Sequence, residues 1–193
     1  MKVIETLKLS AYRFLNLFMS SYEHNGKRGN WIFASRLEDP AKRTKPDAVV
    51  VIPFLKGKPV LIRQFRVPVN DYVIEFPAGL IDGDETPESA ARREIKEETG
   101  LEITKILWES PTMFNSPGIT DECAVVIAAE VEGEISTSLN ESSEDIEVFI
   151  PTANDIYGLV AGKDKDLMDA KVFMFLRLGG FMQGLNFHFG ESK

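Results

Sequence analysis

The segment from Gly79 to Leu101, GLIDGDETPESAARREIKEETGL, constrains this chain more than any other. Thr86 followed by Pro87 is a typical helix start, because a hydroxyl N-cap and a proline at the first helical position both suit the first turn. Gly100 is a typical helix stop, since glycine readily adopts the left-handed conformation that ends many helices. The spacing therefore predicts a helix over residues 86–99.

Three carboxylates share one face of this predicted helix, because Glu94, Glu97 and Glu98 are three and four residues apart. Like charges at this spacing repel by about 0.2–0.5 kcal/mol per pair. A hard divalent cation such as Mg²⁺ or Mn²⁺ relieves that repulsion, because it prefers oxygen ligands and often bridges carboxylates to phosphates. A single Glu pair would instead favour a solvated acidic helix face.

The spacing of the fixed residues removes that alternative. The order and spacing of these residues match every fixed position of the signature called the Nudix box. The matching residues are Gly79, Glu85, Arg93-Glu94, Glu97-Glu98 and Gly100-Leu101. The chain therefore resembles the Nudix hydrolase family. The resemblance implies an α/β/α sandwich with a mixed β-sheet, in which the box forms a loop, a helix and a loop. It also implies hydrolysis of a nucleoside diphosphate linked to another group, with Mg²⁺ or Mn²⁺ as the cofactor.

The same resemblance implies roles for individual positions of the box. Glu94 and Glu98 would be metal ligands, and Glu97 would be a further ligand or would hold a metal-bound water. The carbonyl of Ala78, just before the box, would complete the metal shell. Arg93 would orient the glutamates. The metals would act as Lewis acids on the phosphoryl oxygens and lower the pKa of a bound water.

The flanks of the box resemble the ADP-ribose pyrophosphatase branch of the family. Arg66 lies upstream of the box, and its counterpart in that branch contacts the diphosphate. Glu75 and Glu122 correspond to residues near the metal cluster or the substrate, with Glu122 as a candidate metal ligand. Substrate contacts are also expected from Ser116 and Gly118. Taken alone, the Ser-Pro-Gly sequence would be an ordinary turn.

A late acidic loop over residues 140–147 is the candidate source of the general base. In the branch that the chain resembles, a glutamate from such a loop activates the attacking water. Glu144 is the first candidate and Glu141 the second. Relatives often carry more acidic residues here, whereas this chain has Ser142 and Ser143 between the two glutamates. A solvated charged loop is the alternative interpretation.

Residues 1–45 are expected to form a small β-rich extension, followed by a Nudix domain over residues 46–193. Asn25-Gly26 is a strong hairpin turn signal. A short helix is possible over residues 11–19. The resemblance implies that this region exchanges with the partner subunit of a homodimer and that an aromatic residue in it stacks on the base. Trp31 is the candidate, with a buried core tryptophan as the alternative.

Strands are expected in the rest of the chain near residues 48–55, 59–65, 72–76, 103–113, 122–131 and 146–150. Thr152 is a plausible N-cap for a helix that reaches about Val160, and Asp166 for a second helix over residues 167–178. Strands interrupted by a few helices indicate an α/β or α+β fold.

The composition excludes several classes of protein. The net charge of −8 argues against a nonspecific nucleic-acid binder, which would carry a basic patch. Cys123 is the only cysteine, so an intrachain disulfide and a cysteine-rich zinc site are impossible. No apolar stretch reaches the roughly 20 residues that span a bilayer. These features predict a cytoplasmic protein whose partners include neither a membrane nor nucleic acid. The small nucleotide expected as its partner is implied by the resemblance.

The sequence thus predicts a pyrophosphohydrolase that converts ADP-ribose or another nucleoside diphosphate sugar to a nucleoside monophosphate and a sugar phosphate. One alternative is the same chemistry on GDP-mannose or a dinucleoside polyphosphate. A capped RNA is less favoured, because no basic groove is suggested. A second alternative is a non-catalytic module that senses ADP-ribose, but such modules commonly lose glutamates of the box, and this chain retains all of them.

Overall fold

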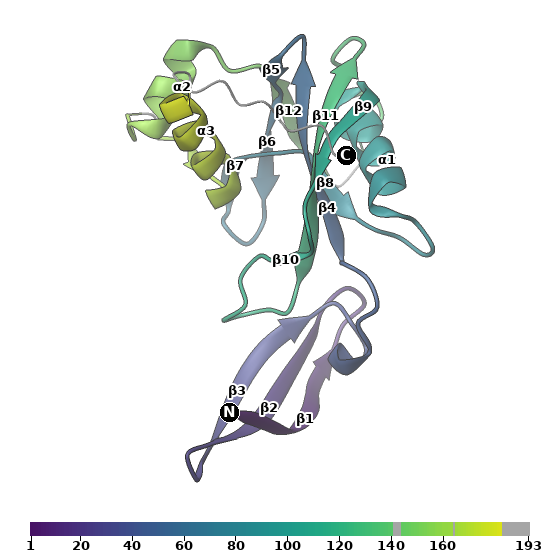
Figure 1. Ribbon diagram of the computed structural model, residues 1–193, viewed down its shortest axis with the longest axis vertical. Helices are drawn as coiled ribbons and strands as arrows, with labels where there is room; N and C mark the ends of the chain where they lie inside the picture. Colours follow the sequence, from purple (N-terminus) through teal and green to yellow (C-terminus); the bar gives the residue numbers. More distant parts are fainter. Residues whose placement is uncertain (141–143, 164, 183–193) are drawn as a thin grey trace, which may run out of the picture. The chain divides into compact units, whose positions relative to one another are not determined.

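The computed structural model describes residues 1–140, 144–163 and 165–182 (Figure 1). The chain divides into two compact units. Unit 1 consists of residues 1–48 and 111–125, and unit 2 of residues 49–110 and 126–193. Within the described residues, none of the helices combines the length and the apolar character that a membrane crossing needs.

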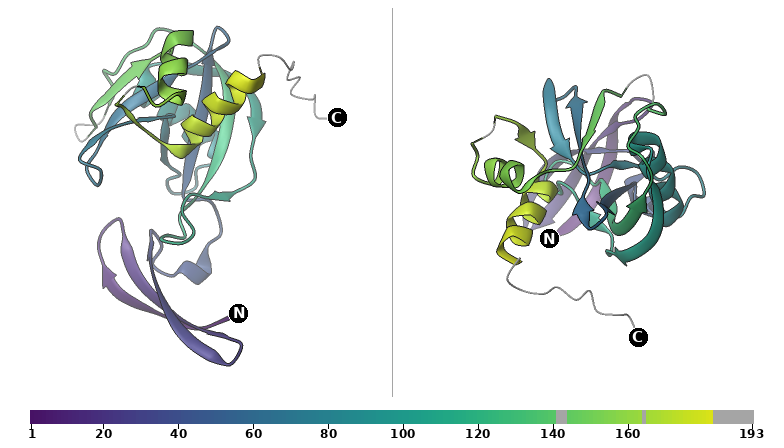
Figure 2. Two further views of the ribbon diagram at one scale, coloured as in Figure 1. Left: turned by 90° about the vertical axis from the view of Figure 1, so that its left-hand side faces the viewer. Right: turned by 90° about the horizontal axis from the view of Figure 1, so that it is seen from above.

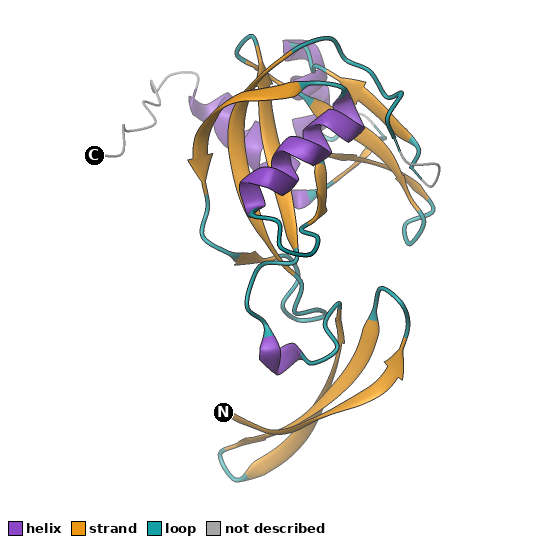
Figure 3. Ribbon diagram, turned by 90° about the vertical axis from the view of Figure 1, so that its right-hand side faces the viewer, coloured by secondary structure: helices purple, strands orange, loops and turns teal. Residues whose placement is uncertain are grey.

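Unit 1 contains a three-stranded antiparallel sheet in the order β1-β2-β3. Its strands are β1 (Lys2–Ala11), β2 (Asn16–His24) and β3 (Lys27–Ser35), drawn in orange next to the N-terminus in Figure 3. Asn25 and Gly26 both have positive φ, 51° and 72°, as the predicted tight hairpin turn requires. The short helix expected over residues 11–19 is wrong. Pairing of β2 with a strand on each side stabilises the extended chain more than a marginal nine-residue helix could be stabilised.

Two further short elements complete unit 1. The 3-10 helix η1 (Pro40–Lys42) follows β3, and Asp39 caps it by accepting a hydrogen bond from the Ala41 amide. Strand β10 (Met113–Phe114) pairs with the first residues of β11 (Cys123–Glu132), where Met113 lies opposite Ala124.

The first sheet of unit 2 contains β4 (Ala48–Leu55), β5 (Lys58–Pro59) and β11 in the order β11-β4-β5. Strand β8 (Ala78–Leu80) pairs with β4, and β9 (Glu102–Glu109) pairs with β11. Every residue of β11 up to Ala129 is buried, which agrees with its continuous apolar sequence.

The second sheet of unit 2 has the order β12-β6-β7-β13. It consists of β12 (Ile146–Phe149), β6 (Leu61–Arg66), β7 (Asp71–Glu75) and β13 (Leu167–Met168). The β13–β7 pair is parallel, whereas the other two pairs of this sheet are antiparallel. In unit 2, α1 lies on one side of the strands, and α2 and α3 lie on the other (Figures 1 and 2). This arrangement confirms the expected α/β/α sandwich with mixed sheets.

The first helix, α1 (Pro87–Thr99), has the ends that the sequence predicts. The Thr86 hydroxyl accepts a hydrogen bond from the Ser89 amide, and the Ser89 hydroxyl accepts one from the Thr86 amide in return. At the other end, Gly100 adopts φ 75° and donates its amide to the Lys96 carbonyl. Local chemistry therefore determines both ends of the helix that carries the box.

Of the two later helices, one begins where the sequence predicts and the other does not. Helix α2 (Ala153–Val160) begins after Thr152, as expected. Helix α3 (Ala170–Met182) begins later than expected, so the prediction of Asp166 as its N-cap is wrong. Residues 167–168 extend as β13 beside β7, and the side chain of Asp169 accepts the amide of Lys171 at 2.7 Å. Because residues 167–168 pair with β7, the helix begins only after them.

Candidate functional site

Two carboxylates of α1 are buried on the same helical face. Glu94 is 8% exposed and Glu98 only 2% exposed, while Ala91 and Ile95 pack the helix against the protein core. One oxygen of Glu98 accepts a hydrogen bond from the amide of Ala78 at 3.1 Å. Strand β8 therefore brings the residue before the box against the second buried carboxylate.

Arg93 forms hydrogen bonds with three carboxylates of the box. Its guanidinium donates to both oxygens of Glu85 at 3.0 Å, to Glu94 at 2.7 Å and to Glu97 at 3.0 Å. A further bond of 2.9 Å reaches the carbonyl of Leu80. The hydrogen bonds to Glu85 contribute most to raising the pKa of Arg93, so the guanidinium stays charged. The arginine thus holds the carboxylates in place, which is the arrangement expected of an orienting residue.

Burial disfavours the charged form of both carboxylates of the pair. Burial raises the pKa of Glu98 to about 9, and the negative charges of Glu94 and Glu144 add to this effect. Burial also raises the pKa of Glu94, although its bond to Arg93 opposes the rise. The charged form of two buried carboxylates is unfavourable. It is relieved either by a proton or by a bound cation.

Gly79 is required for the position of Glu94. A Cβ atom at residue 79 would lie 1.7 Å from Oε1 of Glu94, which is an impossible contact. The carboxylate therefore occupies the space that any other side chain would fill. This close approach explains why glycine, rather than alanine, opens the box.

Gly79→Ala is expected to lower metal-dependent activity by about tenfold to a hundredfold and leave the fold intact. The added methyl group must displace the Glu94 carboxylate, which is the flexible end of a side chain, so the backbone need not move. The measurement is kcat as a function of metal concentration, together with the melting temperature. Gly179→Ala is the matched control, because a Cβ there meets nothing within 4 Å. Unchanged activity in Gly79→Ala would show that the position of Glu94 is unimportant.

Strand β6 brings Arg66 to the buried carboxylates from the sheet side. Arg66 donates two hydrogen bonds of 2.8 Å to the two oxygens of Glu75 on β7. These bonds raise the pKa of Arg66, and the charges of Glu98 and Asp169 add to the rise. Arg66 is therefore close enough to Glu98 for their charges to interact. Asp169 was not among the predicted residues, because its place near Arg66 follows only from the pairing of β13 with β7.

The pairing of β12 with β6 positions the segment that contains Glu144 beside the end of β6. Ile146 lies opposite Gln64 in this antiparallel ladder, and the Phe65 amide donates to the Asp145 carbonyl at 3.0 Å. Glu144 precedes Asp145 in the chain, just before β12 begins. Its charge contributes to the raised pKa of both glutamates of the pair. The structure thus brings Glu144 to the site, whereas Glu141 lies outside the described residues.

The remaining predicted residues lie in unit 1. The indole nitrogen of Trp31 donates to the carbonyl of Gly118 at 3.1 Å. Ser116 closes the turn before β11, since its carbonyl accepts the amides of Ile119 and Thr120 at 2.9 and 3.0 Å. The Trp31 side chain is 53% exposed, so the alternative of a buried core tryptophan is wrong.

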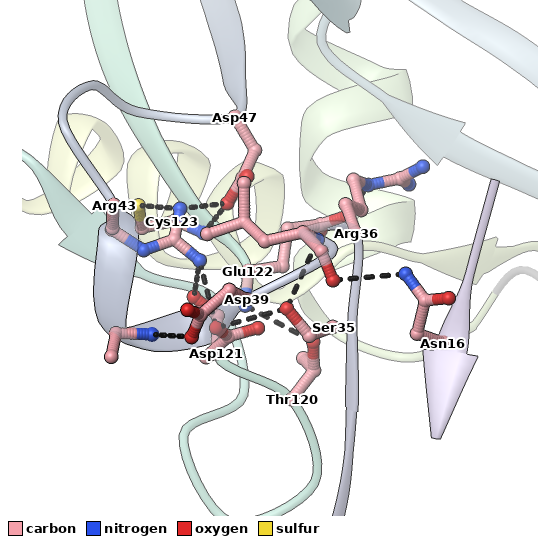
Figure 4. A network of polar contacts seen from close by, with 12 residues as sticks. Asn16, Ser35, Arg36, Asp39, Arg43, Asp47, Thr120, Asp121, Glu122 and Cys123 are labelled. Atoms are coloured by element: carbon pink, nitrogen blue, oxygen red, sulfur yellow. Dashed lines mark hydrogen bonds and ion pairs between the residues drawn. The ribbon is translucent and has the colours of Figure 1, made fainter. Parts of the chain in front are cut away.

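Glu122 is held by two side chains of unit 1. It forms an ion pair with Arg36 and accepts a hydrogen bond from the side chain of Asn115 at 3.0 Å. Figure 4 shows Glu122 within a wider polar network of this unit. There Arg43 bonds to Asp47 at 2.6 Å and to the carbonyl of Asp121 at 2.9 Å. These contacts attach the turn before β11 to the segment that follows β3.

The described residues contain no group of three or more His, Cys, Asp or Glu side chains arranged to hold a metal ion. The donor chemistry of the α1 site nevertheless fits a hard cation. It offers the buried carboxylates of Glu94 and Glu98, and the space at Gly79 that Glu94 enters. The side chain of Glu97, which pairs with Arg93 at 3.0 Å, is 42% exposed.

Comparison with known proteins agrees with this fold. The model of the NUDIX domain matches residues 44–169. The chain is similar to "Putative nudix hydrolase 2" of Caenorhabditis elegans, with 34% identity over 73% of this chain and 67% of that protein. It is also similar to "ADP-ribose pyrophosphatase" of Saccharomyces cerevisiae, with 40% identity over 65% of this chain and 58% of that protein.

The fold is shared over almost the whole chain with a solved structure described as "Crystal structure of ADP compounds hydrolase". The two structures have a TM-score of 0.70 and 20% sequence identity, with 96% of this chain and 95% of the other covered. Since the domain match also spans more than half of the sequence, this chain belongs to the NUDIX family.

Proposed function

We propose that this protein is a metal-dependent pyrophosphohydrolase that cleaves the diphosphate of ADP-ribose or a related nucleoside diphosphate sugar. The products would be a nucleoside monophosphate and a sugar phosphate. The observation that carries this proposal is the buried pair Glu94 and Glu98, within electrostatic range of Arg66 and Glu144. Similarity to a yeast ADP-ribose pyrophosphatase supports the choice of substrate.

The proposed metal is Mg²⁺ or Mn²⁺, because all the available donors are oxygen atoms. Glu94, Glu98 and the carbonyl of Ala78 would hold it, with Glu97 as a further ligand or the holder of a bound water. When bound, such an ion polarises the phosphoryl oxygens and lowers the pKa of a coordinated water.

Arg66 and Glu144 would act on the substrate from the sheet side. Glu75 holds Arg66 through two N–H groups, and the remaining N–H groups can donate to the oxygens of the diphosphate. Glu144 would take the proton of the attacking water, because its charge acts on both Glu94 and Glu98. Arg93 would keep the box carboxylates oriented during this step.

Trp31 would provide an aromatic surface for the base. Unit 1 contains an apolar cavity of about 420 Å³, and its lining includes Trp31, Phe33, Phe114 and Pro117. The bond from the Trp31 indole to Gly118 holds the ring at this cavity and ties it to the turn that begins at Ser116. Stacking on Trp31 would recognise a purine without requiring a charged partner.

A homodimer is part of this proposal. Large apolar side chains are exposed along the sheet of unit 1, namely Val3, Ile4, Leu7, Leu9, Leu17 and Ile32. A second copy of the chain would cover some of them, because exposed apolar surface often marks a protein–protein interface. The molar mass measured by light scattering at micromolar concentration is expected to be that of two chains. A monomer mass would contradict the dimer.

A cytoplasmic location is also proposed. The only cysteine, Cys123, is a buried free thiol. A protein without a disulfide suits a reducing compartment.

The function is tested by measuring phosphate release in a coupled phosphatase assay with Mg²⁺ or Mn²⁺. The substrates would be ADP-ribose, ADP-glucose, GDP-mannose, UDP-glucose, diadenosine polyphosphates and deoxynucleoside triphosphates. We expect the diphosphate sugars to react with kcat/KM of about 10⁴ M⁻¹ s⁻¹ or more. Reaction of triphosphates or dinucleotides alone would contradict the assigned substrate. Binding of ADP-ribose without turnover would instead indicate a sensing module.

A further inference from the structure

The side chain of Asp145, next to the proposed base, is held by a contact that the proposed chemistry does not use. The hydroxyl of Tyr72 on β7 donates to Oδ2 of Asp145 at 2.5 Å. The backbone of Asp145 is held as well, because its carbonyl accepts the Phe65 amide at 3.0 Å. Asp145 is therefore attached to β6 by its backbone and to β7 by its side chain.

The ring of Tyr72 is itself fixed by its neighbours. The Arg63 guanidinium lies over the ring, 4.1 Å from its centroid. The Phe65 ring packs edge-on against it, with 5.4 Å between the ring centroids. Phe65 lies opposite Tyr72 in the β6–β7 ladder, so these contacts come from the facing strand. The hydroxyl is thus presented to Asp145 by a ring with little freedom to move.

Strand geometry links this contact to Glu144. Successive side chains of an extended strand point to opposite faces of a sheet. Phe65 and Tyr72 share one face of the β6–β7 ladder, and Arg66 lies on the other. In an extended segment leading into β12, an Asp145 side chain on the face of Tyr72 sets that of Glu144 on the face of Arg66. A slip of one residue would reverse both side chains and remove Glu144 from the buried carboxylates. The bond from Tyr72 opposes such a slip.

We propose that Tyr72 is a positioning residue, which holds Asp145 on one face of the sheet and thereby places Glu144 on the face of Arg66 and Glu98. This inference rests on the proposed function, because it assumes that Glu144 accepts a proton during hydrolysis. Tyr72 itself is not among the residues proposed to contact the substrate or the metal. Loss of its hydroxyl should therefore reduce kcat through Glu144 and leave KM unchanged.

The test compares Tyr72→Phe with the wild type in two backgrounds, the native chain and Glu144→Gln. In the native chain we expect kcat to fall about tenfold, with KM within about twofold, because one hydrogen bond to a charged acceptor is lost. In the Glu144→Gln background we expect almost no further loss, since the residue being positioned can no longer act. Tyr157→Phe is the matched control, because this exposed tyrosine lies on α2, where the Lys163 ammonium approaches its hydroxyl at 3.5 Å.

Two further variants separate the hydrogen bond from the rest of the side chain. Asp145→Asn keeps an acceptor oxygen and should retain most of the activity, whereas Asp145→Ala should match Tyr72→Phe. Hydrogen exchange at the Phe65 amide gives a readout that needs no substrate. It should become faster in Tyr72→Phe, because that amide is bonded to Asp145.

The outcomes distinguish the inference from the proposed function. An inactive wild-type protein would overturn the function, together with any role for Tyr72 in it. An active wild type with an unaffected Tyr72→Phe variant would overturn the inference alone. An equal reduction of kcat by Tyr72→Phe in both backgrounds would also overturn the inference alone, since the effect would then not pass through Glu144.

Discussion

Glu98→Gln is expected to lower kcat by about three orders of magnitude while making the metal-free protein more stable at pH 8. The proposed metal loses a charged ligand, and the amide that replaces it is a much weaker one. The backbone has no reason to move, because glutamine has nearly the same shape and its oxygen can still accept the Ala78 amide. A substitution that destroys activity and raises stability is characteristic of a buried charge kept for function.

The sign of the stability change follows from the pKa of Glu98. Burial raises this pKa from 4.5 to about 9 in the folded, metal-free chain. The contribution of Glu98 to stability is therefore fully present below about pH 4.5 and is lost as the pH rises toward 9. At pH 8 the unfolded chain is ionised at this residue while the folded chain resists ionisation. A neutral glutamine removes this difference. We expect the free energy of unfolding to rise by about 1–3 kcal/mol.

The measurements are kcat with saturating metal, and the free energy of unfolding in a chelator at pH 5 and pH 8. We expect the gain in stability to be larger at pH 8 than at pH 5. Glu102→Gln is the control, because Glu102 is an exposed glutamate paired with Lys96 outside the site. Near-normal turnover by Glu98→Gln would remove Glu98 from the set of metal ligands.

Glu144→Gln is expected to lower kcat by about a hundredfold or more, which is the usual contribution of a general base. Metal affinity should change little, because Glu144 is not among the proposed ligands. KM should also change little, since Arg66 supplies the proposed contact with the diphosphate. The pH–rate profile of this variant should differ from that of the wild type.

The control for Glu144 is Glu147→Gln. Glu147 lies three residues further along the same segment, where its carboxylate pairs with Arg63 at 3.3 Å. Its removal takes away a similar charge on the opposite face of the ladder. An unchanged rate and pH profile in Glu144→Gln would assign the base to another residue. An equal loss in both variants would show that the segment, rather than the carboxylate of Glu144, matters.

Local interactions explain why the helix of the box could be predicted so closely. The cap at Thr86 and the stop at Gly100 depend on residues within one turn of each end. The spacing of Glu94 and Glu98 places them on one face in any α-helix. Their burial was not predictable, because it depends on β8 and on the close approach of Gly79 to Glu94.

The errors arose where a neighbouring strand overrides local preference. Residues 11–19 could form a weak helix in isolation, but pairing with β1 and β3 extends β2 through part of this range. Residues 167–168 resemble the first turn of a helix, yet they pair with β7. In both places the decisive hydrogen bonds come from partners that no local pattern identifies.

The sequence by itself determined the helix that carries the box and the carboxylates on its face, because these follow from spacing and from caps within a few residues. The sandwich fold was implied by the resemblance of the box to the Nudix family. The tertiary structure alone decided which groups meet those carboxylates. Arg66 with Glu75, Tyr72 with Asp145, and Asp169 beside Arg66 are brought together by the order β12-β6-β7-β13. The contacts of Asp145 and Asp169 join segments distant in the chain, so their energies depend on the whole packed core rather than on any segment of it.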